Sequence, residues 1–284
     1  MKMSLDCIPC IINNFVQLLK KDDIPETIRE PALRRLLTFL AQADYRQSPP
    51  VLGRDIHRMI RQELNNPDPY RDVKIRYNQM LLDLYPKFEA MVNQAEDSFD
   101  TAMRLAIAGN VIDFGAQHQL DILETIDRVM GAQLAIDDSQ LLKADLAAAN
   151  HLLYIGDNCG EIVLDKLFLS HIEVENITFV VRDGPVINDI TMEDAQMVGI
   201  DQIADIITTG DDSPGAVWET ASDEFKHIFN SADVIISKGQ GNLEGLLGIP
   251  GNIYFLFVSK CDLIANEIGV RRGDFVVKQN PRRA

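Results

Sequence analysis

Carboxylate and amide side chains follow two apolar runs of the kind that form buried strands. Asp157 and Asn158 come just after Leu152–Ile155, and Asp189 ends the turn that follows Ile177–Val181. Two carboxylates and one amide oxygen are hard ligands that suit Mg²⁺ or Mn²⁺ and leave positions for water and a phosphate oxygen. We therefore expect Asp157, Asn158 and Asp189 to hold a divalent cation.

A third apolar run is followed by a stretch that could bind phosphate, the SKGQGN sequence of residues 237–242. Lys238 supplies a compact positive charge, while Gly239 and Gly241 allow backbone amides to approach an anion at the start of the next helix. Neither the phosphate-loop motif nor the dinucleotide G-x-G-x-x-G motif is present. We expect Lys238, Gly239, Gly241 and Asn242 to contact a substrate phosphate.

The same residue types are also ordinary after strands, because Asp, Asn and Gly are common in turns and helix caps. Asp189 stands two residues before Thr191 and could itself belong to a cap. At any single position this simpler interpretation stays open. The coincidence after three strands favours a site, since the carboxyl ends of parallel strands meet at one edge of a sheet.

Two further acids, Glu161 and Asp194, are candidates for orienting an attacking water in such a site. Each could instead support the metal ligands, or lie in the first turn of a helix and complement its dipole. The sequence does not choose between them.

A polar interruption in the amino-terminal half offers two more candidates. The segment AGNVIDFG, residues 108–115, breaks an apolar helix. Gly109 could simply end that helix, or the segment could reach over the pocket and place Asn110 and Asp113 near the substrate. Both interpretations stay open.

The cysteines give a weaker signal. Cys7 and Cys10 have the spacing of a redox or metal-binding pair, but tetrahedral zinc needs two more ligands, and Cys159 and Cys261 are isolated in the sequence. No histidine is marked as a base for Cys159, and no serine-hydrolase motif occurs. A redox or zinc protein organised by Cys7 and Cys10 remains an alternative.

The elements that must position these residues divide the chain into two parts. From Cys7 to about Leu146, apolar residues recur at three- and four-residue spacing, which predicts six or seven helices. After His151, continuous apolar runs alternate with helical pieces, which predicts a mostly parallel sheet with helical crossovers. A last run, Asp274–Lys278, suits an antiparallel edge strand. The other predicted strands are Leu152–Ile155, Ile177–Val181, Ile203–Thr208, Val234–Ser237 and Ile253–Val258.

Composition limits the possible partners. Over 284 residues, 43 acidic and 27 basic side chains give a net charge of −16, which disfavours nucleic acid and anionic membrane surfaces. The amino-terminal apolar stretch is too short to span a bilayer and no cleavage site follows it, so we expect a cytoplasmic protein with reduced thiols.

The ordered motifs resemble the metal-dependent damage-control phosphatases, first catalogued as domain of unknown function eighty-nine. The leading C-x-x-C is similar to the compact archaeal and bacterial branch. The matching segments are Cys7-Ile8-Pro9-Cys10, Asp68-Pro69-Tyr70 with Lys74, Gly109-Asn110-Val111-Ile112-Asp113, Gly156-Asp157-Asn158-Cys159-Gly160-Glu161, Asn188-Asp189-Ile190-Thr191 with Asp194, and Ser237-Lys238-Gly239-Gln240-Gly241-Asn242.

The change in pattern predicts a helical domain at residues 1–147 and an α/β domain at 148–284. The resemblance implies that the second domain is Rossmann-like, with three layers. It also implies a cation on Asp157, Asn158 and Asp189, and phosphate on Lys238. Members of the family hydrolyse phosphate monoesters, including sugar phosphates and damaged or side-product metabolites, often with Mn²⁺, Co²⁺ or Ni²⁺ in preference to Mg²⁺. We therefore expect a small phosphorylated metabolite as partner, and the oligomeric state stays open.

Two other functions are alternatives. A non-catalytic protein could bind metal and phosphometabolite in the same pocket without turnover. A carboxyl methyltransferase activity has been proposed for one branch of the family, but this sequence has no glycine-rich loop of the kind that binds a methyl-donor cofactor.

Overall fold

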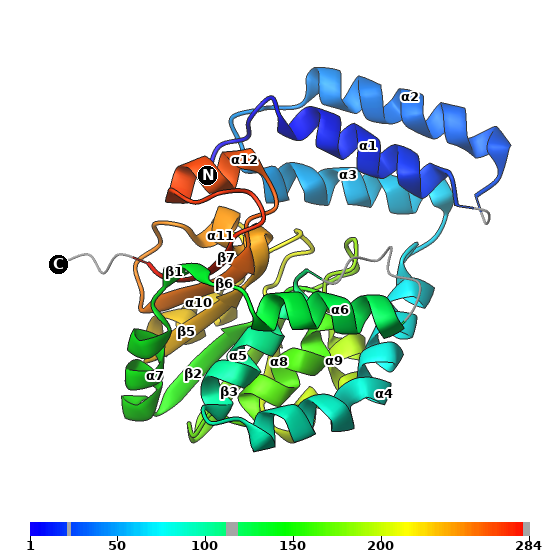
Figure 1. Ribbon diagram of the computed structural model, residues 1–284. Coiled ribbons are helices and arrows are strands. Elements are labelled where there is room, and N and C mark those ends of the chain that lie inside the picture. Colours follow the sequence, from blue (N-terminus) through cyan, green and yellow to red (C-terminus); the bar gives the residue numbers. More distant parts are fainter. Residues whose placement is uncertain (22–23, 112–118, 281–284) are drawn as a thin grey trace.

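In a computed structural model the chain is described over residues 1–21, 24–111 and 119–280, which contain twelve α-helices and seven strands (Figure 1). The helices are α1 (Cys7–Leu19), α2 (Glu26–Gln42), α3 (Pro49–Leu64), α4 (Arg71–Gln94), α5 (Ser98–Gly109), α6 (Gln119–Met130), α7 (Ser139–Ala148), α8 (Glu161–Leu169), α9 (Met192–Val198), α10 (Asp223–Ser231), α11 (Gly239–Leu246) and α12 (Asp262–Ile268). The strands are β1 (Leu134–Asp137), β2 (His151–Ile155), β3 (Asn176–Val181), β4 (Asp205–Thr208), β5 (Val234–Lys238), β6 (Ile253–Val258) and β7 (Phe275–Gln279).

These strands form one sheet in the order β1-β7-β6-β5-β2-β3-β4. All neighbours pair in parallel except β6 and β7, which are antiparallel. Every residue of β5 and β6 is buried, because helices cover both faces of the sheet, and this is why their apolar runs are continuous. The predicted α/β class with a mostly parallel sheet is confirmed.

Two expectations about the sheet were wrong. Residues Leu134–Asp137 fall in the half predicted to be helical, yet they form the edge strand β1. Only Leu134 of its four residues is buried, so no continuous apolar run marks the strand. Strand β7 is antiparallel, as predicted, but it lies between β6 and β1 and is not an edge.

The helices form two layers on the sheet and a separate group above it. Helices α4 to α9 share a core with one face of the sheet, and α10, α11 and α12 share a core with the other. Helices α1, α2 and α3 have a core of their own and lie side by side, away from the sheet (Figure 1). We call this three-helix group the cap.

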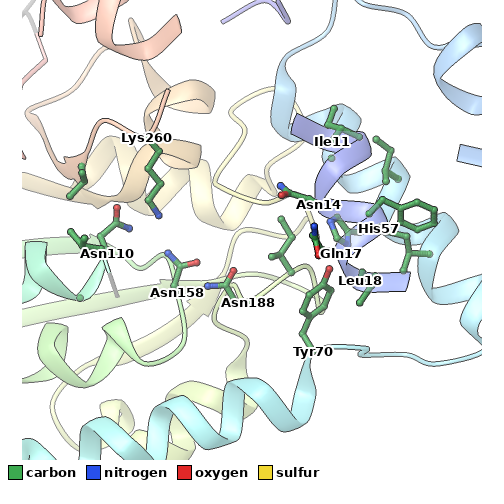
Figure 2. A pocket seen from close by; sticks show the side chains of 18 of the residues that line it. Ile11, Asn14, Gln17, Leu18, His57, Tyr70, Asn110, Asn158, Asn188 and Lys260 are labelled. Carbon is green, nitrogen blue, oxygen red and sulfur yellow. The ribbon is translucent and has the colours of Figure 1, made fainter. Parts of the chain in front are cut away.

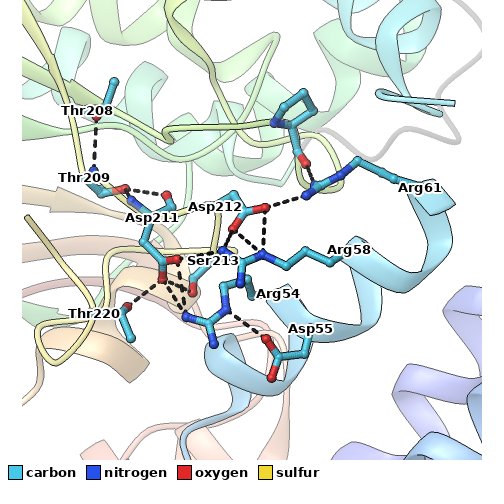
Figure 3. A network of polar contacts seen from close by, with 12 residues as sticks. Arg54, Asp55, Arg58, Arg61, Thr208, Thr209, Asp211, Asp212, Ser213 and Thr220 are labelled. Atoms are coloured by element: carbon cyan, nitrogen blue, oxygen red, sulfur yellow. Dashed lines mark hydrogen bonds and ion pairs between the residues drawn. The ribbon is translucent and has the colours of Figure 1, made fainter.

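Helix α3 joins the cap to the loop that follows β4 (Figure 3). Arg58 Nε donates to Asp212 Oδ1 at 2.9 Å, and Arg61 donates to the other oxygen at 2.5 Å. Arg54 lies 3.3 Å from Asp211. Burial raises the pKa of Asp212, but hydrogen bonds from Arg58 and Arg61 outweigh it and hold this pKa below its ordinary value. The charges therefore fix the cap over the carboxyl end of the sheet.

We expect Asp212→Asn to lower the free energy of unfolding by roughly 1 to 3 kcal/mol, because it weakens charged hydrogen bonds to two arginines. Since the folded-state pKa of Asp212 is lowered, its stabilisation is complete above the ordinary value of 3.8 and is lost as the pH falls through the lower folded value. Urea unfolding at several pH values measures the difference, with the exposed Glu219→Gln as control. An equal loss in both variants would contradict this account.

Candidate functional site

Two loops at the carboxyl end of the sheet are joined by their backbones. Asn158 and Asp189 form an antiparallel bridge between the loop after β2 and the loop after β3. Cys159 N donates to Asn188 O at 2.9 Å, and Ile190 N donates to Asp157 O at 3.0 Å. The structure therefore brings Asp157, Asn158 and Asp189 together, at the edge where the sequence analysis expected them.

Asp157 lies in a crowded and poorly solvated position. Its Oδ2 accepts hydrogen bonds from Asn110 Nδ2 at 2.9 Å and from Asn158 Nδ2 at 2.5 Å. Burial raises the pKa of Asp157 to about 7, and the nearby carboxylates of Glu161 and Asp189 add to this effect. Position 239 must be glycine, because a Cβ there would lie 1.9 Å from Asp157 Oδ2.

Asp189 is held by a buried arginine that sequence reasoning missed. Arg182 Nε donates to Asp189 Oδ2 at 2.7 Å, and the Gly215 amide donates to the same oxygen at 3.1 Å. Arg182 also lies 3.6 Å from Asp157 Oδ1. Burial raises the pKa of Asp189 although Arg182 opposes the shift. Arg182 directly follows β3, so the strand-end rule could have identified it.

The amides of Asn110 and Asn158 bridge Asp157 and Glu161. Each Nδ2 group donates to both carboxylates, with distances to Glu161 Oε2 of 3.0 Å from Asn110 and 3.1 Å from Asn158. Within the described part of the chain, Asn110 Oδ1 is buried without a hydrogen-bond partner. A buried carbonyl oxygen of this kind needs a donor or a cation.

The chemistry of this group fits a divalent cation. Two buried carboxylates and amide oxygens are the ligands that Mg²⁺ and Mn²⁺ prefer, and the raised pKa values of Asp157 and Asp189 show that their negative charge is incompletely offset by protein groups. Nowhere in residues 1–21, 24–111 and 119–280 do three His, Cys, Asp or Glu side chains form a metal-binding group. Within these residues, Cys7 and Cys10 in the first turn of α1 therefore do not belong to a metal-binding group of this kind. A metal site formed by Asp157, Asn158 and Asp189 would need amide oxygens as well as carboxylates.

The structure does not place Lys238 where the sequence analysis expected it. Its ammonium group is fully buried and donates to Ala106 O at 2.9 Å, Glu161 Oε1 at 2.6 Å and Asp165 Oδ1 at 2.5 Å. Burial disfavours the charge, but the two carboxylates outweigh it and raise the pKa of Lys238. All three protons are used inside the protein, so Lys238 does not reach a substrate phosphate in this geometry. A strand-end position does not reveal the direction of the side chain.

The rest of the expected phosphate loop also faces inward. Asn242 is fully buried, accepts a hydrogen bond from Ala216 N at 2.6 Å and donates to Gly156 O at 3.0 Å. A Cβ at Gly241 would meet Pro214 O at 2.9 Å. Gly239, Gly241 and Asn242 thus pack the loops together, and none of them lines the cavity described below.

The two candidate water-orienting acids have protein partners as well. Asp194 Oδ2 accepts from Lys74 Nζ and Thr191 N, both at 2.9 Å, and so caps α9. Glu161 is buried between Lys238 and the two amides. Asp194 therefore stabilises the start of α9, while Glu161 orients the side chains of Asn110 and Asn158. Neither residue lines the cavity.

A cavity of about 800 Å³ opens between this site and the cap (Figure 2). On the sheet side, Asn110, Asn158, Asn188 and Lys260 face it, and the cap supplies the opposite wall. Sequence reasoning missed Lys260, although it stands two residues after β6, and could not have found the cap residues, which no strand-end rule marks. The labelled cap-side residues in the view are Ile11, Asn14, Gln17, Leu18, His57 and Tyr70.

Asn110 thus lies in the wall of the cavity, where one of the two interpretations of its segment placed it. Asp113, the other candidate from that segment, lies outside the described residues. No helix of the described chain combines the length and the apolar character that crossing a membrane would require.

Fold and site together define an α/β protein with a buried acid-and-amide centre beneath a helical cap. Residues 3–276 match the model of the damage-control phosphatase ARMT1-like domain, and the chain belongs to this family. The expected family is therefore confirmed.

Relatives match over almost their whole length. The chain is 37% identical to an uncharacterised protein of Methanocaldococcus jannaschii, with 97% of this chain and 95% of that protein covered. It is 32% identical to a damage-control phosphatase of Pyrococcus horikoshii, covering 99% of both chains, and 33% identical to a damage-control phosphatase of Archaeoglobus fulgidus, covering 98% and 99%. The crystal structure of a DUF89 family protein from P. horikoshii superposes with a TM-score of 0.88 at 32% identity, covering 99% of this chain and 100% of that one.

The raised pKa of Asp157 gives a testable pH dependence. A cation must displace a proton from Asp157 below about pH 7, so the affinity of the metal-free protein for Mn²⁺ should fall as the pH decreases, by on the order of tenfold per unit. Isothermal titration calorimetry between pH 5 and pH 8 measures this. An affinity independent of pH over that range would contradict the proposed ligand role of Asp157.

Proposed function

We propose that this chain is a metal-dependent phosphatase that hydrolyses phosphate monoesters of small metabolites, such as sugar phosphates or damaged and side-product phosphometabolites. The observation that carries the proposal is the pair of buried carboxylates, Asp157 and Asp189, behind the cavity wall, where Asn110 and Asn158 both contact Asp157 and line a cavity large enough for a metabolite. Two relatives at 32% and 33% identity carry the name damage-control phosphatase, which supports the same function.

Asp157, Asn158 and Asp189 would hold the cation, which we propose to be Mn²⁺, Mg²⁺, Co²⁺ or Ni²⁺. Divalent cations supply two things in hydrolysis of phosphate esters: they polarise a phosphoryl oxygen, and they lower the pKa of a bound water. The remaining work falls to the protein. Catalysis of this kind depends mainly on positioning and on stabilising charge that develops in the transition state.

The buried Glu161–Lys238 pair positions the ligands before substrate binds. Lys238 fixes one oxygen of Glu161 at 2.6 Å, and the other oxygen accepts from the Asn110 and Asn158 amides. This arrangement sets the rotation of both amides, so their carbonyl oxygens have a defined orientation. Glu161 and Lys238 are therefore positioning residues in the proposed mechanism.

Lys260 is the proposed phosphate-binding residue. It faces the cavity beside Asn110 and Asn158, close enough to Asp157 to lower the pKa of that carboxyl group (Figure 2). An ammonium group there would bind the phosphoryl oxygens that the cation does not contact and would offset their charge as the ester bond breaks.

The activity test uses phosphate release from a panel of phosphate monoesters with several divalent cations. We expect Asp157→Asn and Asp189→Asn to lower kcat/KM by on the order of 10²- to 10³-fold or more, because each removes a charged ligand. Asp183→Asn is the matched control, since Asp183 is an exposed acid in the same loop as Asp189. Metal-dependent binding without release would overturn the phosphatase in favour of a non-catalytic binding protein.

A second pair of variants separates the two lysines. Lys260→Met should lower kcat/KM by roughly 10- to 100-fold with little change in Tm, since Lys260 is exposed and contacts only substrate in this account. Lys238→Met should instead lower the free energy of unfolding by roughly 3 to 5 kcal/mol, because it leaves Glu161 and Asp165 buried without their partner. A stable Lys238→Met protein with a selective loss of phosphate affinity would restore Lys238 as the phosphate ligand.

A further inference from the structure

Two cysteines with the spacing C-x-x-C open the first helix of the cap. Cys7 is the first residue of α1 and Cys10 is the fourth, so both side chains lie in its first turn and on the same face. Within the described residues they belong to no metal-binding group, and both are free thiols. Both are therefore available for redox chemistry, which the proposed phosphatase mechanism does not use.

The helix holds the two thiols at a separation that suits a disulfide. Cα atoms three residues apart in an α-helix are about 5 Å from each other, and disulfides span Cα separations of roughly 4.4 to 6.8 Å. Pro9, between the two cysteines, is compatible with the first turn because the N–H groups there have no partner within the helix. A bond between Cys7 and Cys10 can therefore form by rotation of the two side chains on the existing backbone of α1.

The two thiols differ in their surroundings. Cys10 is exposed, whereas Cys7 is half-buried. Burial raises the pKa of Cys7 although a backbone hydrogen bond at Ser4 opposes the shift, and the nearby Glu244 carboxylate and Cys261 add to it. Because the thiolate is the nucleophile in thiol–disulfide exchange, Cys10 suits the attack on an incoming disulfide, and Cys7 suits the second step that closes the bond.

The pair lies beside the contact between the cap and the α/β part of the chain. Met1 N donates to Glu244 O of α11 at 3.1 Å, which places the amino-terminal segment on α11. In the same helix, Gln240 Nε2 donates to Cys261 Sγ at 3.4 Å, and Gln240 Oε1 accepts from Lys260 N at 2.9 Å. The start of the cap and the loop that carries Lys260 therefore meet on α11, and Cys261 is a third thiol near the pair.

Cys10 also contacts the wall of the cavity. Asn14 Nδ2, one turn further along α1, donates to Cys10 Sγ at 3.8 Å. Asn14 lines the cavity and lies across it from Lys260 (Figure 2). A rotation that brings Cys10 Sγ to Cys7 takes it away from Asn14, so a disulfide would break this hydrogen bond.

We infer that Cys7 and Cys10 form a reversible disulfide, and that its formation changes the cap wall of the cavity at Asn14. The oxidant is a low-molecular-weight disulfide. Cys10 Sγ attacks one of its sulfur atoms and the other leaves as a thiol; Cys7 Sγ then attacks Cys10 Sγ and releases the second thiol. The two protein thiols lose two protons and two electrons, and the two small thiols gain them.

Peptide masses test the pairing. Trypsin should release residues 3–20, which contain Cys7 and Cys10 and no other cysteine. After incubation with excess glutathione disulfide and blocking with N-ethylmaleimide, this peptide should be unlabelled and lighter by two hydrogen atoms than the reduced, unlabelled peptide. Treatment with dithiothreitol before blocking should restore two labels. A doubly labelled peptide after oxidation, or one linked to the peptide that contains Cys261, would overturn the inference.

Single-cysteine variants test the order of the two steps. In Cys7→Ser, the exposed Cys10 should be trapped as a mixed disulfide with glutathione. In Cys10→Ser, the same adduct on Cys7 should form on the order of tenfold more slowly, because Cys7 is half-buried and its pKa is raised. Cys261→Ser is the matched control and should form the wild-type disulfide. Equal rates for the two adducts would overturn the assigned order, and loss of the disulfide in Cys261→Ser would overturn the pairing.

The link to the cavity rests on the proposed phosphatase function. Oxidised wild-type protein should hydrolyse a phosphate monoester with a kcat/KM about two- to tenfold below that of the reduced protein, as expected for the loss of one neutral hydrogen bond. Asn14→Ala should make kcat/KM insensitive to oxidation, while Asn13→Ala, at the exposed neighbouring position, should keep the response. An unchanged kcat/KM on oxidation of the wild-type protein would overturn the link.

The peptide measurement needs no turnover. If no phosphate monoester is hydrolysed, the proposed function fails, but the disulfide between Cys7 and Cys10 is still found or excluded by mass. Calorimetric titration of the oxidised and reduced Mn²⁺-loaded proteins with glucose 6-phosphate then measures the effect on the cavity. Weaker binding to the oxidised protein supports the role of Asn14, and equal affinities exclude it.

Discussion

The close burial of two carboxylates, Asp157 and Asp189, is the constraint on which the rest of the structure depends. Burying like charges together is unfavourable. Hydrogen bonds from Arg182 and the Gly215 amide to Asp189, and from the side-chain amides of Asn110 and Asn158 to Asp157, reduce this cost. Burial nevertheless raises the pKa of both carboxyl groups, so these contacts do not fully compensate for removing the two charges from water. A divalent cation would supply the missing positive charge. The same two carboxylates therefore account both for the unfavourable electrostatics of the site and for its proposed metal chemistry.

The elements around Asp157 and Asp189 hold these two carboxylates in place. Glu161 and Lys238 fix the amides from below, and their own burial is compensated by Asp165 and the Ala106 carbonyl. The cap acts from the other side, since the arginines of α3 hold the loop whose Gly215 amide contacts Asp189. A Cβ at Gly53 of α3 would lie 2.8 Å from Pro214 in the same loop, so the helix and the loop are in close contact. These contacts therefore connect the wall of the cavity to Asp189, the proposed metal ligand.

The sequence predicted the parts of the site that follow from strand topology. Continuous apolar runs identified the central strands, and the rule that parallel strands end at one edge brought Asp157, Asn158 and Asp189 together. The strand-end rule does not give the direction of a side chain. Lys238, at the end of β5, was therefore expected to bind phosphate, although its side chain points into the core. Strand β1 was not predicted, because a short edge strand with one buried residue has no periodic pattern of apolar residues.

The remaining parts depend on tertiary contacts between distant segments. The arginines of α3 meet their aspartates across about 150 residues of sequence, a separation at which local patterns carry no information. The same holds for the cap wall, where Asn14 of α1 and His57 of α3 lie across the cavity from Lys260 only because the cap folds over the sheet. Lys260 and Arg182 are different: both follow strands, and the rule that identified Asp157 applies to them as well.

The most direct test of the account is the position of a bound metal ion. Crystals grown with Mn²⁺ and measured near the manganese absorption edge should show an anomalous peak within coordinating distance of oxygen atoms from Asp157, Asn158 and Asp189. An ordered manganese ion elsewhere, with these three side chains bound only to protein and water at saturating Mn²⁺, would contradict it.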